Sequence, residues 1–306
     1  MSAPAPEGQP PVLAPEAVLQ RLDWTVVRRL DGLLQGDYRT LFYGHGLDLA
    51  DIREYQPEDD VRYIDWNVTA RMNAPYVRQY HEDREITAHF LCDLSPSLDF
   101  GTVRAHKRGV LEDLVGVLAR LLTRHGNRVG AILYNGTVER AIPAGGGRAQ
   151  VLRVLSEIQR SPHLSHAPYT ALSDLIDAAA RTIRRRSLIF VVSDFFSAPG
   201  WESALGRLAM RNEVIAVRVT DPREREIPDI GWVTMTDAET GQQVQVDTHD
   251  RGFRMRFADV VARHEGSLRA AFAHAGVDLL SVSTEDSLVQ ALLRFAEARR
   301  LRRARH

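Results

Sequence analysis

The chain has 306 residues, of which 44% are hydrophobic and 26% are charged, and its formal net charge is −1. This length allows one large or two modest domains, and a core of that size forms without disulfides. Because opposite charges nearly balance, no global field would recruit nucleic acid or a membrane surface. The single cysteine, Cys92, excludes an internal disulfide framework.

The sequence carries no sign of membrane insertion or export. No apolar run approaches the roughly 20 residues that cross a bilayer, so we expect no direct membrane span. The first residues lack the basic and apolar regions of a signal peptide. With only one cysteine, these features predict a cytoplasmic protein.

The N-terminal part divides into three stretches. Residues 1–15 are rich in Pro and Ala and are predicted to form a disordered arm. Residues 16–35 carry apolar side chains at helical spacing, which predicts an amphipathic helix. Residues 36–87 are dense in Asp, Arg, Tyr and Trp, and we expect an extended, partly stranded lead-in there. The helix and the lead-in together form a predicted N-terminal segment, 16–87.

From residue 88 onward, predicted strands alternate with predicted helices. Strands are expected at 88–92, 129–134, 137–142, 187–192, 213–219 and 278–282. Helices are expected at 104–125, 149–160, 171–185, 201–211, 253–275 and 286–303. This alternation predicts an α/β domain with a doubly wound, mostly parallel sheet over residues 88–300. We also expect a small hairpin insertion at about 231–248 and a basic tail at 301–306.

Two predicted strands end in carboxylates. Asp93 follows the first strand of the sheet and Asp194 follows the apolar strand at 187–192. In open α/β sheets, ligands bind beyond the carboxyl ends of the strands, so neighbouring strands would bring these two acids together. Ser95 and Ser97 follow Asp93 at alternate positions and can face the same point. Hard oxygen donors gathered in this way suit Mg²⁺.

The string Asp93-Leu94-Ser95-Pro96-Ser97 is weakly specific when taken alone, because clusters of Ser and Asp mostly form turns and helix caps. Its context favours a metal site. It follows a predicted buried strand, precedes a long predicted helix, and is matched by a second strand that ends in an acid.

This string resembles the metal-ion-dependent adhesion site of von Willebrand A (vWA) domains. The lead-in resembles that of one bacterial branch, the "domain of unknown function 58" family, often encoded beside MoxR-type AAA+ ATPases. The matching residues are Gly46-Leu47-Asp48-Leu49, Ile52-Arg53-Glu54-Tyr55, Asp59-Asp60-Val61-Arg62, Ile64-Asp65-Trp66 and Ala70-Arg71. Within it, Glu58 and Met72 stand where this branch usually has Gly and Thr.

The resemblance implies a Rossmann-like vWA domain that binds Mg²⁺, or alternatively Mn²⁺. The implied ligands are Asp93, Ser95, Ser97, Thr170 and Asp194. It further implies that the ion keeps a position open for a carboxylate from a protein partner. A MoxR-type AAA+ ATPase is the implied associate, in the assembly or maturation of other proteins.

Two other functions are open at this point. A Mg²⁺-dependent phosphohydrolase would need a general acid two residues after Asp93, where this chain has Ser95. A structural protein with an unused site is the other alternative. No Gly-x-Ser-x-Gly elbow and no P-loop occur in the sequence, so we expect a non-catalytic protein.

The charged lead-in invites two interpretations. Its Arg and Asp residues and Trp66 could form a docking face for a partner. The simpler interpretation is a segment pinned to the core by ion pairs and by packing of Trp66.

Overall fold

The computed structural model describes residues 13–33, 51–57, 59, 61, 64, 66–72, 74–79, 85–101, 105–164, 167 and 170–303. The predicted disordered arm lies outside this set up to residue 12, as do much of the lead-in and the last three residues of the predicted tail. Pro15, the last residue of the predicted arm, already begins the first helix.

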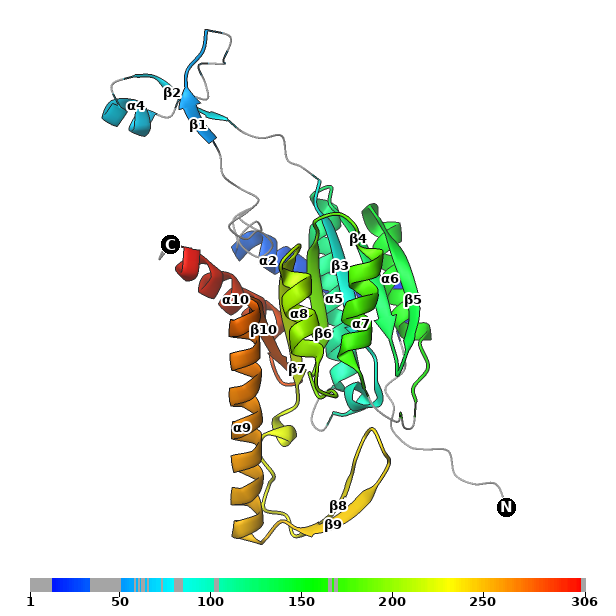
Figure 1. Cartoon of the computed structure of the whole chain (residues 1–306). Coiled ribbons are helices and arrows are strands. Elements are labelled where there is room, and N and C mark those ends of the chain that lie inside the picture. Colours follow the sequence, from blue (N-terminus) through cyan, green and yellow to red (C-terminus); the bar gives the residue numbers. More distant parts are fainter. Residues whose placement is uncertain are drawn as a thin grey trace.

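The described residues form helices and strands close to the predicted bounds (Figure 1). The strands are β1 (Asp51–Glu54), β2 (Tyr76–Gln79), β3 (Thr87–Asp93), β4 (Arg128–Tyr134), β5 (Val138–Gly145), β6 (Leu188–Ser193), β7 (Glu213–Thr220), β8 (Trp232–Thr236), β9 (Gln243–Asp247) and β10 (Asp278–Ser283). The helices are α1 (Pro15–Leu22), α2 (Arg28–Leu33), α4 (Trp66–Met72), α5 (Lys107–Arg124), α6 (Gly147–Arg160), α7 (Leu172–Thr182), α8 (Trp201–Ala209), α9 (Arg251–Ala275) and α10 (Leu288–Arg303).

A six-stranded sheet forms the centre of the molecule, in the order β10-β7-β6-β3-β4-β5. Five of its strands run parallel, and β5 pairs antiparallel with β4 at one edge. Numbered within the sheet, this is the doubly wound 3-2-1-4-5-6 order, which reverses between β3 and β6. The predicted α/β class, with a doubly wound and mostly parallel sheet, is confirmed. The reversal point is where such sheets bind ligands, and Asp93 and Asp194 follow these two strands.

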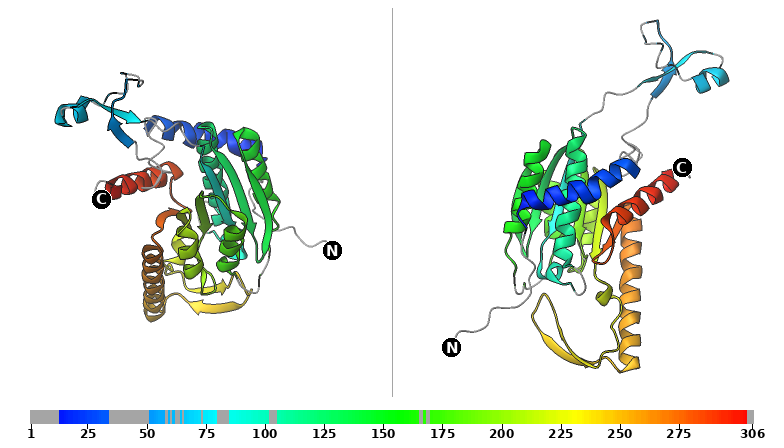
Figure 2. Two further views of the ribbon diagram at one scale, coloured as in Figure 1. Left: turned by 45° about the horizontal axis from the view of Figure 1, so that its top comes forward. Right: turned by 180° about the vertical axis from the view of Figure 1, so that it is seen from behind.

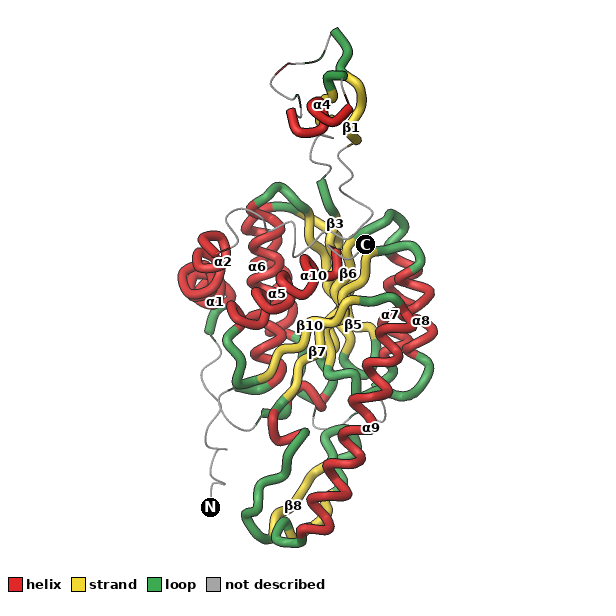
Figure 3. The backbone as a smooth tube through the Cα atoms, turned by 90° about the vertical axis from the view of Figure 1, so that its left-hand side faces the viewer, coloured by secondary structure: helices red, strands yellow, loops and turns green. Residues whose placement is uncertain are grey.

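Helices cover both faces of the sheet (Figures 2 and 3). Alternate residues of β6 face opposite sides of the sheet and belong to two separate hydrophobic cores, each of which needs a layer of helices to cover it. Phe190 stacks on Phe90 at 5.0 Å between ring centroids and belongs to the core that includes residues of α1, α5, α6 and α10. Val191 packs with α7, α8 and α9 on the other face. A strand buried on both faces must be apolar throughout, as its sequence predicts.

The predicted helix at 16–35 is found as α1, a π-helical turn at Asp23–Val27 and α2. It lies across the outside of α5 and α6 (Figure 2). A Cβ atom on Gly116 of α5 would come within 2.9 Å of the Leu22 side chain. The absence of a side chain at this glycine therefore allows the two helices to approach closely.

In the described part of the lead-in, β1 pairs antiparallel with β2, and α4 lies between them in the chain. Figure 1 shows this unit standing apart from the α/β body. Trp66 is 70% exposed, so the expected packing of this side chain against the core is not found. The family-like residues Gly46–Leu49 lie outside the described residues.

The C-terminal helix ends where the sequence predicts. Helix α10 continues through Arg303, the last residue of the helix expected at 286–303. Arg299 is buried and pairs with Glu213 and Asp278, so it fixes the helix to the sheet. Among the residues that the structure describes, no helix is long and apolar enough to cross a bilayer.

Glu112 lies half-buried on α5, where Gln159 of α6 donates a hydrogen bond to its carboxylate. Burial raises the pKa of Glu112 to about 6, and the Gln159 hydrogen bond opposes this rise only in part. The folded protein therefore holds this proton more tightly than the unfolded chain does. Stability falls as the pH rises from the unfolded pKa through the folded one.

Replacing Glu112 with Gln should stabilise the protein above pH 6 and change little below the ordinary pKa of a glutamate. The expected gain at high pH is about 1–2 kcal/mol. Urea denaturation at about pH 4 and about pH 8 measures the difference. An equal effect of the substitution at both pH values would contradict this account.

Candidate metal centre

Asp93 is the last residue of β3, and the chain then turns sharply into a 3₁₀ turn at Pro96–Asp99. The Ser95 N–H donates to Asp93 Oδ1 at 3.0 Å, which closes the turn. The hydroxyls of Ser95 and Ser97 lie 3.2 Å apart, with both side chains buried. Three oxygen donors therefore face one point, as the alternating pattern predicts.

The end of β6 contributes the second acid. Ser193 Oγ donates to Asp93 Oδ2 at 2.7 Å, which ties the two strand ends together. Asp194 is fully buried, and its Oδ1 accepts from the Phe196 N–H at 3.0 Å. Phe195 between them has a φ of 62°, a left-handed conformation that is strained for a bulky residue. The backbone here is bent to direct the carboxylate inward.

Thr170 lies just before α7 and is buried. Its hydroxyl donates at 3.0 Å to Oε1 of Glu239, which belongs to the turn between β8 and β9. Glu239 is half-buried, and Ser97 also lies close enough to lower the pKa of its carboxyl. The sequence predicts Glu239 in a turn but does not indicate that this turn reaches the site.

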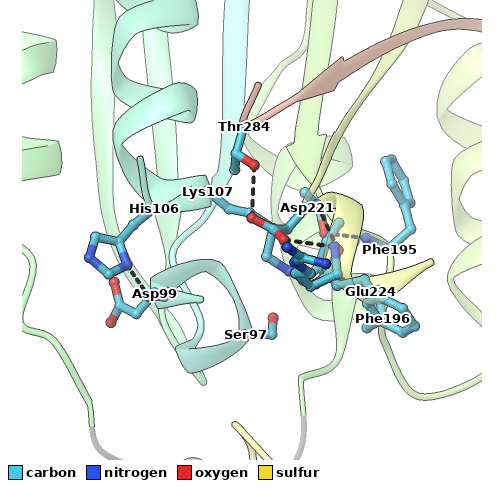
Figure 4. Close-up of polar contacts among 12 residues, drawn as sticks. Ser97, Asp99, His106, Lys107, Phe195, Phe196, Asp221, Glu224 and Thr284 are labelled. Carbon is cyan, nitrogen blue, oxygen red and sulfur yellow. Dashed lines mark hydrogen bonds and ion pairs between the residues drawn. The ribbon is translucent and has the colours of Figure 1, made fainter. Parts of the chain in front are cut away.

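A buried lysine stands beside Asp194, and sequence reasoning missed it. Lys107, the first residue of α5, places its Nζ 2.6 Å from Asp194 Oδ2 and 2.5 Å from Glu224 Oε1 (Figure 4). Burial alone would lower the pKa of Lys107, but the charges of Asp194 and Glu224 outweigh it and raise that pKa. The ammonium is therefore held in its charged form.

Glu224 could have been noticed in the sequence. Asp221 and Glu224 form a capping box directly after β7, in which Asp221 accepts from Arg223 N and Glu224 accepts from Asp221 N. Thr284 Oγ1 also donates to Asp221 Oδ2 at 2.8 Å (Figure 4). The Asp-x-x-Glu spacing directly after a strand is the sequence signal for Glu224. Lys107, which contacts Glu224 in the folded chain, has no comparable signal in the sequence.

The site holds more negative than positive charge. Burial, followed by the charge of Asp194, raises the pKa of Asp93 to about 7. Four carboxyl groups lie in this region (Asp93, Asp194, Glu224 and Glu239). The ammonium of Lys107 opposes them, together with the guanidinium of Arg218, which donates to the Asp194 carbonyl and pairs with Glu265. Buried like charges raise one another's free energy, so this arrangement favours the uptake of a cation.

The oxygen donors fit a small divalent cation in kind and spacing. Octahedral ligands of Mg²⁺ lie about 3 Å from their neighbours, given metal–oxygen distances of about 2.1 Å. The 3.2 Å separation of the Ser95 and Ser97 hydroxyls is close to that value. In the part of the chain that the structure describes, no three His, Cys, Asp or Glu side chains form a metal-binding group. A cation here would depend on hydroxyl donors.

The five residues predicted as metal ligands occupy one buried region, and each lies on one of three loops. Asp93, Ser95 and Ser97 lie on the first loop. Thr170 lies on the second loop and donates to Glu239, which also lies close to Ser97. Asp194 lies on the third loop, and its charge raises the pKa of Asp93. Both oxygens of Asp194 already have donors. Because each carboxylate oxygen has two lone pairs, Asp194 can still coordinate a cation or accept a hydrogen bond from a water bound to one.

Aromatic rings surround the buried lysine on its outer side. The rings of Phe100 and Phe196 lie 5.8 and 5.9 Å from Lys107 Nζ, within the range of cation–π attraction. Phe196 stacks on His264 of α9 at 4.9 Å between centroids. Phe100 and Phe196 are 38% and 41% exposed, so a partner that reaches the site would contact them.

The sequence profile of the family described as Protein of unknown function DUF58 matches residues 51–267. Uncharacterized proteins of Mycobacterium tuberculosis and Mycobacterium bovis are each 38% identical to this chain over 284 residues. These matches cover 93% of this chain and 89% of each relative.

Two solved structures are similar at low identity. The conserved hypothetical protein BatB from Bacteroides thetaiotaomicron is 18% identical, with a TM-score of 0.43, over 70% of this chain and 98% of that one. The SpRpn10 VWA domain is 13% identical, with a TM-score of 0.38, over 68% of this chain and 93% of that one.

Removing the buried ammonium should strongly destabilise the fold. Replacing Lys107 with Met leaves the buried Asp194 and the partly buried Glu224 without their cation, which should cost about 3–5 kcal/mol. Urea denaturation in the presence of a chelator measures the loss. The double variant Lys107→Met/Glu224→Gln removes one of the two charges and should recover part of that stability. A single variant as stable as wild type would show that the lysine does not balance these acids.

Proposed function

The chain belongs to the family described as Protein of unknown function DUF58, and we propose that it is a non-catalytic, Mg²⁺-dependent protein-binding module. The observation that carries the proposal is the gathering of buried carboxylates and hydroxyls where the sheet order reverses. The coupled acids Asp93 and Asp194 favour a cation, and the hydroxyls of Ser95 and Ser97 are spaced to share one.

In this proposal Asp93, Ser95, Ser97, Thr170 and Asp194 hold Mg²⁺, with Mn²⁺ as the alternative. A bound ion of this kind would supply positive charge for a carboxylate of the protein partner. Neighbouring residues orient the two acidic ligands: Ser193 donates a hydrogen bond to Asp93, and Lys107 donates one to Asp194. The exposed faces of Phe100 and Phe196 would add apolar contact area.

The partner that family resemblance suggests is a MoxR-type AAA+ ATPase. Such an enzyme would couple ATP hydrolysis to the assembly or maturation of other proteins, and this chain would link it to them. Such a pairing would require the chain to lie in the cytoplasm, where ATP is available.

The geometry gives little support for catalysis. A phosphohydrolase with an aspartyl nucleophile at Asp93 would need an acid two residues later, and Ser95 is a buried hydroxyl that contacts Ser97. A serine donates no proton usefully near neutral pH. Lys107 also lies beside Asp194, but its pKa is raised by two carboxylates that hold its proton.

One observation favours a second candidate, a structural protein with an unused site. Lys107 already places a cation against Asp194. If that ammonium alone balanced the site, no metal would be required, and the acids would serve only to fix α5 to β6. Metal binding separates the two candidates.

We expect wild-type protein to bind one Mg²⁺ or Mn²⁺ ion in isothermal titration calorimetry. Replacing Asp93 with Asn should weaken binding at least about tenfold, because it removes one of the two charges among the proposed ligands. Asp99→Asn is a matched control. Asp99 lies in the same turn, but it pairs with His163 and Arg108 outside the donor set. Undiminished binding by the Asp93 variant would favour the structural candidate.

Partner capture should depend on the same residues. In a pull-down with a MoxR-type ATPase of the same organism, wild-type protein should retain the ATPase in Mg²⁺ and lose it in a chelator. Asp93→Asn and Asp194→Asn should capture several-fold less, and Asp99→Asn should match wild type. Equal capture by all four proteins would show that the contact does not involve the site.

A further inference from the structure

The hairpin β8–β9 reaches the site by its tip alone. Its strands pair in register from Trp232 with Asp247 to Thr236 with Gln243. Most side chains of both strands are exposed, including Trp232 at 73%. Figure 1 shows the hairpin crossing below the sheet toward the loops at its carboxyl edge. With so little packing along its length, the hairpin is fixed mainly at its base and its tip.

The tip has a defined turn. Asp237 Oδ1 accepts from the N–H groups of Glu239 and Thr240, each at 2.9 Å. Gly241 has a φ of 71°, and its N–H donates to the Asp237 carbonyl at 2.9 Å. These bonds present the Glu239 side chain in one direction before any contact with the body.

Glu239 then docks on the loop that carries Thr170. Its carbonyl accepts from the Ala167 N–H at 3.0 Å, and its Oε1 accepts from Thr170 Oγ1 at 3.0 Å. The two contacts use both main chain and side chain, so the carboxyl group is held firmly. Its neighbours are Thr170 and Ser97, two of the proposed metal ligands.

The other oxygen of this carboxyl group is unusual. Glu239 Oε2 is buried, and it has no hydrogen-bond partner among the residues that the structure describes. A glutamine would keep the Thr170 hydrogen bond without adding a charge. A buried carboxylate oxygen that is left unpaired beside hydroxyls of the proposed site is typical of a cation ligand.

We propose that Glu239 is an internal ligand of the site, which holds the position that a partner's carboxylate would otherwise take. This inference rests on the proposed Mg²⁺ site. The hairpin then acts as a latch: a partner gains access when its own acid displaces Glu239. Because the hairpin strands are exposed, the tip can withdraw without disturbing the core.

The test uses the full chain with Mn²⁺ as the probe, because Mn²⁺ relaxes the protons of the water molecules bound to it. Calorimetry gives the affinity, and water proton relaxation reports how many waters the bound ion keeps. In Glu239→Ala, a water should replace the carboxylate, so relaxivity should rise by about one water equivalent. Mn²⁺ affinity should fall about threefold to tenfold. Glu239→Gln should change relaxivity and affinity in the same directions, and it keeps the size and shape of the side chain at the hairpin tip.

Acetate then serves as a minimal stand-in for a partner's carboxylate. Added to the Mn²⁺-loaded Glu239→Ala protein, it should lower relaxivity by displacing water. With wild-type protein it should have little effect, because Glu239 occupies the position. Thr240→Ala, which alters the neighbouring exposed residue of the same turn, should match wild type in every measurement.

The outcomes separate the two proposals. If wild type and both Glu239 variants bind Mn²⁺ with equal relaxivity and equal response to acetate, the internal ligand is wrong while the metal site stands. If wild-type protein binds no Mn²⁺, the metal site is wrong and the internal ligand fails with it. Thermal melts of each variant establish that any loss of binding is not a loss of fold.

Discussion

The structure is organised around the burial of two like charges, Asp93 and Asp194, at the ends of neighbouring strands. Neither carboxylate can be moved independently, because Ser193 bonds to the first and lies next to the second in the chain. Two like charges that are buried together repel each other, and several nearby residues offset this repulsion or hold the two acids in place. Lys107 reaches in from α5, Glu224 holds the lysine from the loop after β7, and Phe195 adopts a strained backbone beside them.

Sequence patterns predict the scaffold of this site well. A strand buried on both faces must be apolar, so β6 can be recognised in the sequence. Asp194, which follows β6 directly, is then conspicuous as an acid at the end of an apolar run. The hairpin of β4 and β5 follows from Asn135-Gly136, since glycine accepts the left-handed backbone of such a turn. With strands and helices placed, the sheet order brings Asp93 and Asp194 together. These features are local in the chain, which is why they can be inferred from it.

The partners of these acids are not local, and the sequence does not reveal them. Lys107 lies 87 residues from Asp194 and 117 from Glu224, at a helix start where a cation is electrostatically unfavourable. Glu239 lies 69 residues from Thr170 and looks like any exposed turn residue. Arg299 likewise resembles a solvated helix end until Glu213 and Asp278 are seen beside it. Only the folded chain shows which charges are buried together.

The hairpin and α9 are one continuous piece of chain that contacts the site from two sides. Glu239 meets Thr170 at the hairpin tip, while Glu265 of α9 pairs with Arg218, whose Nε donates to the Asp194 carbonyl. The buried residues of α9, Leu268 and Phe272, both lie in its second half, and the first half extends beyond the sheet (Figure 1). A pull on that projecting half would therefore bear on both contacts at once. In mechanical terms the segment is a lever that joins the contact at Thr170 to the contact beside Asp194.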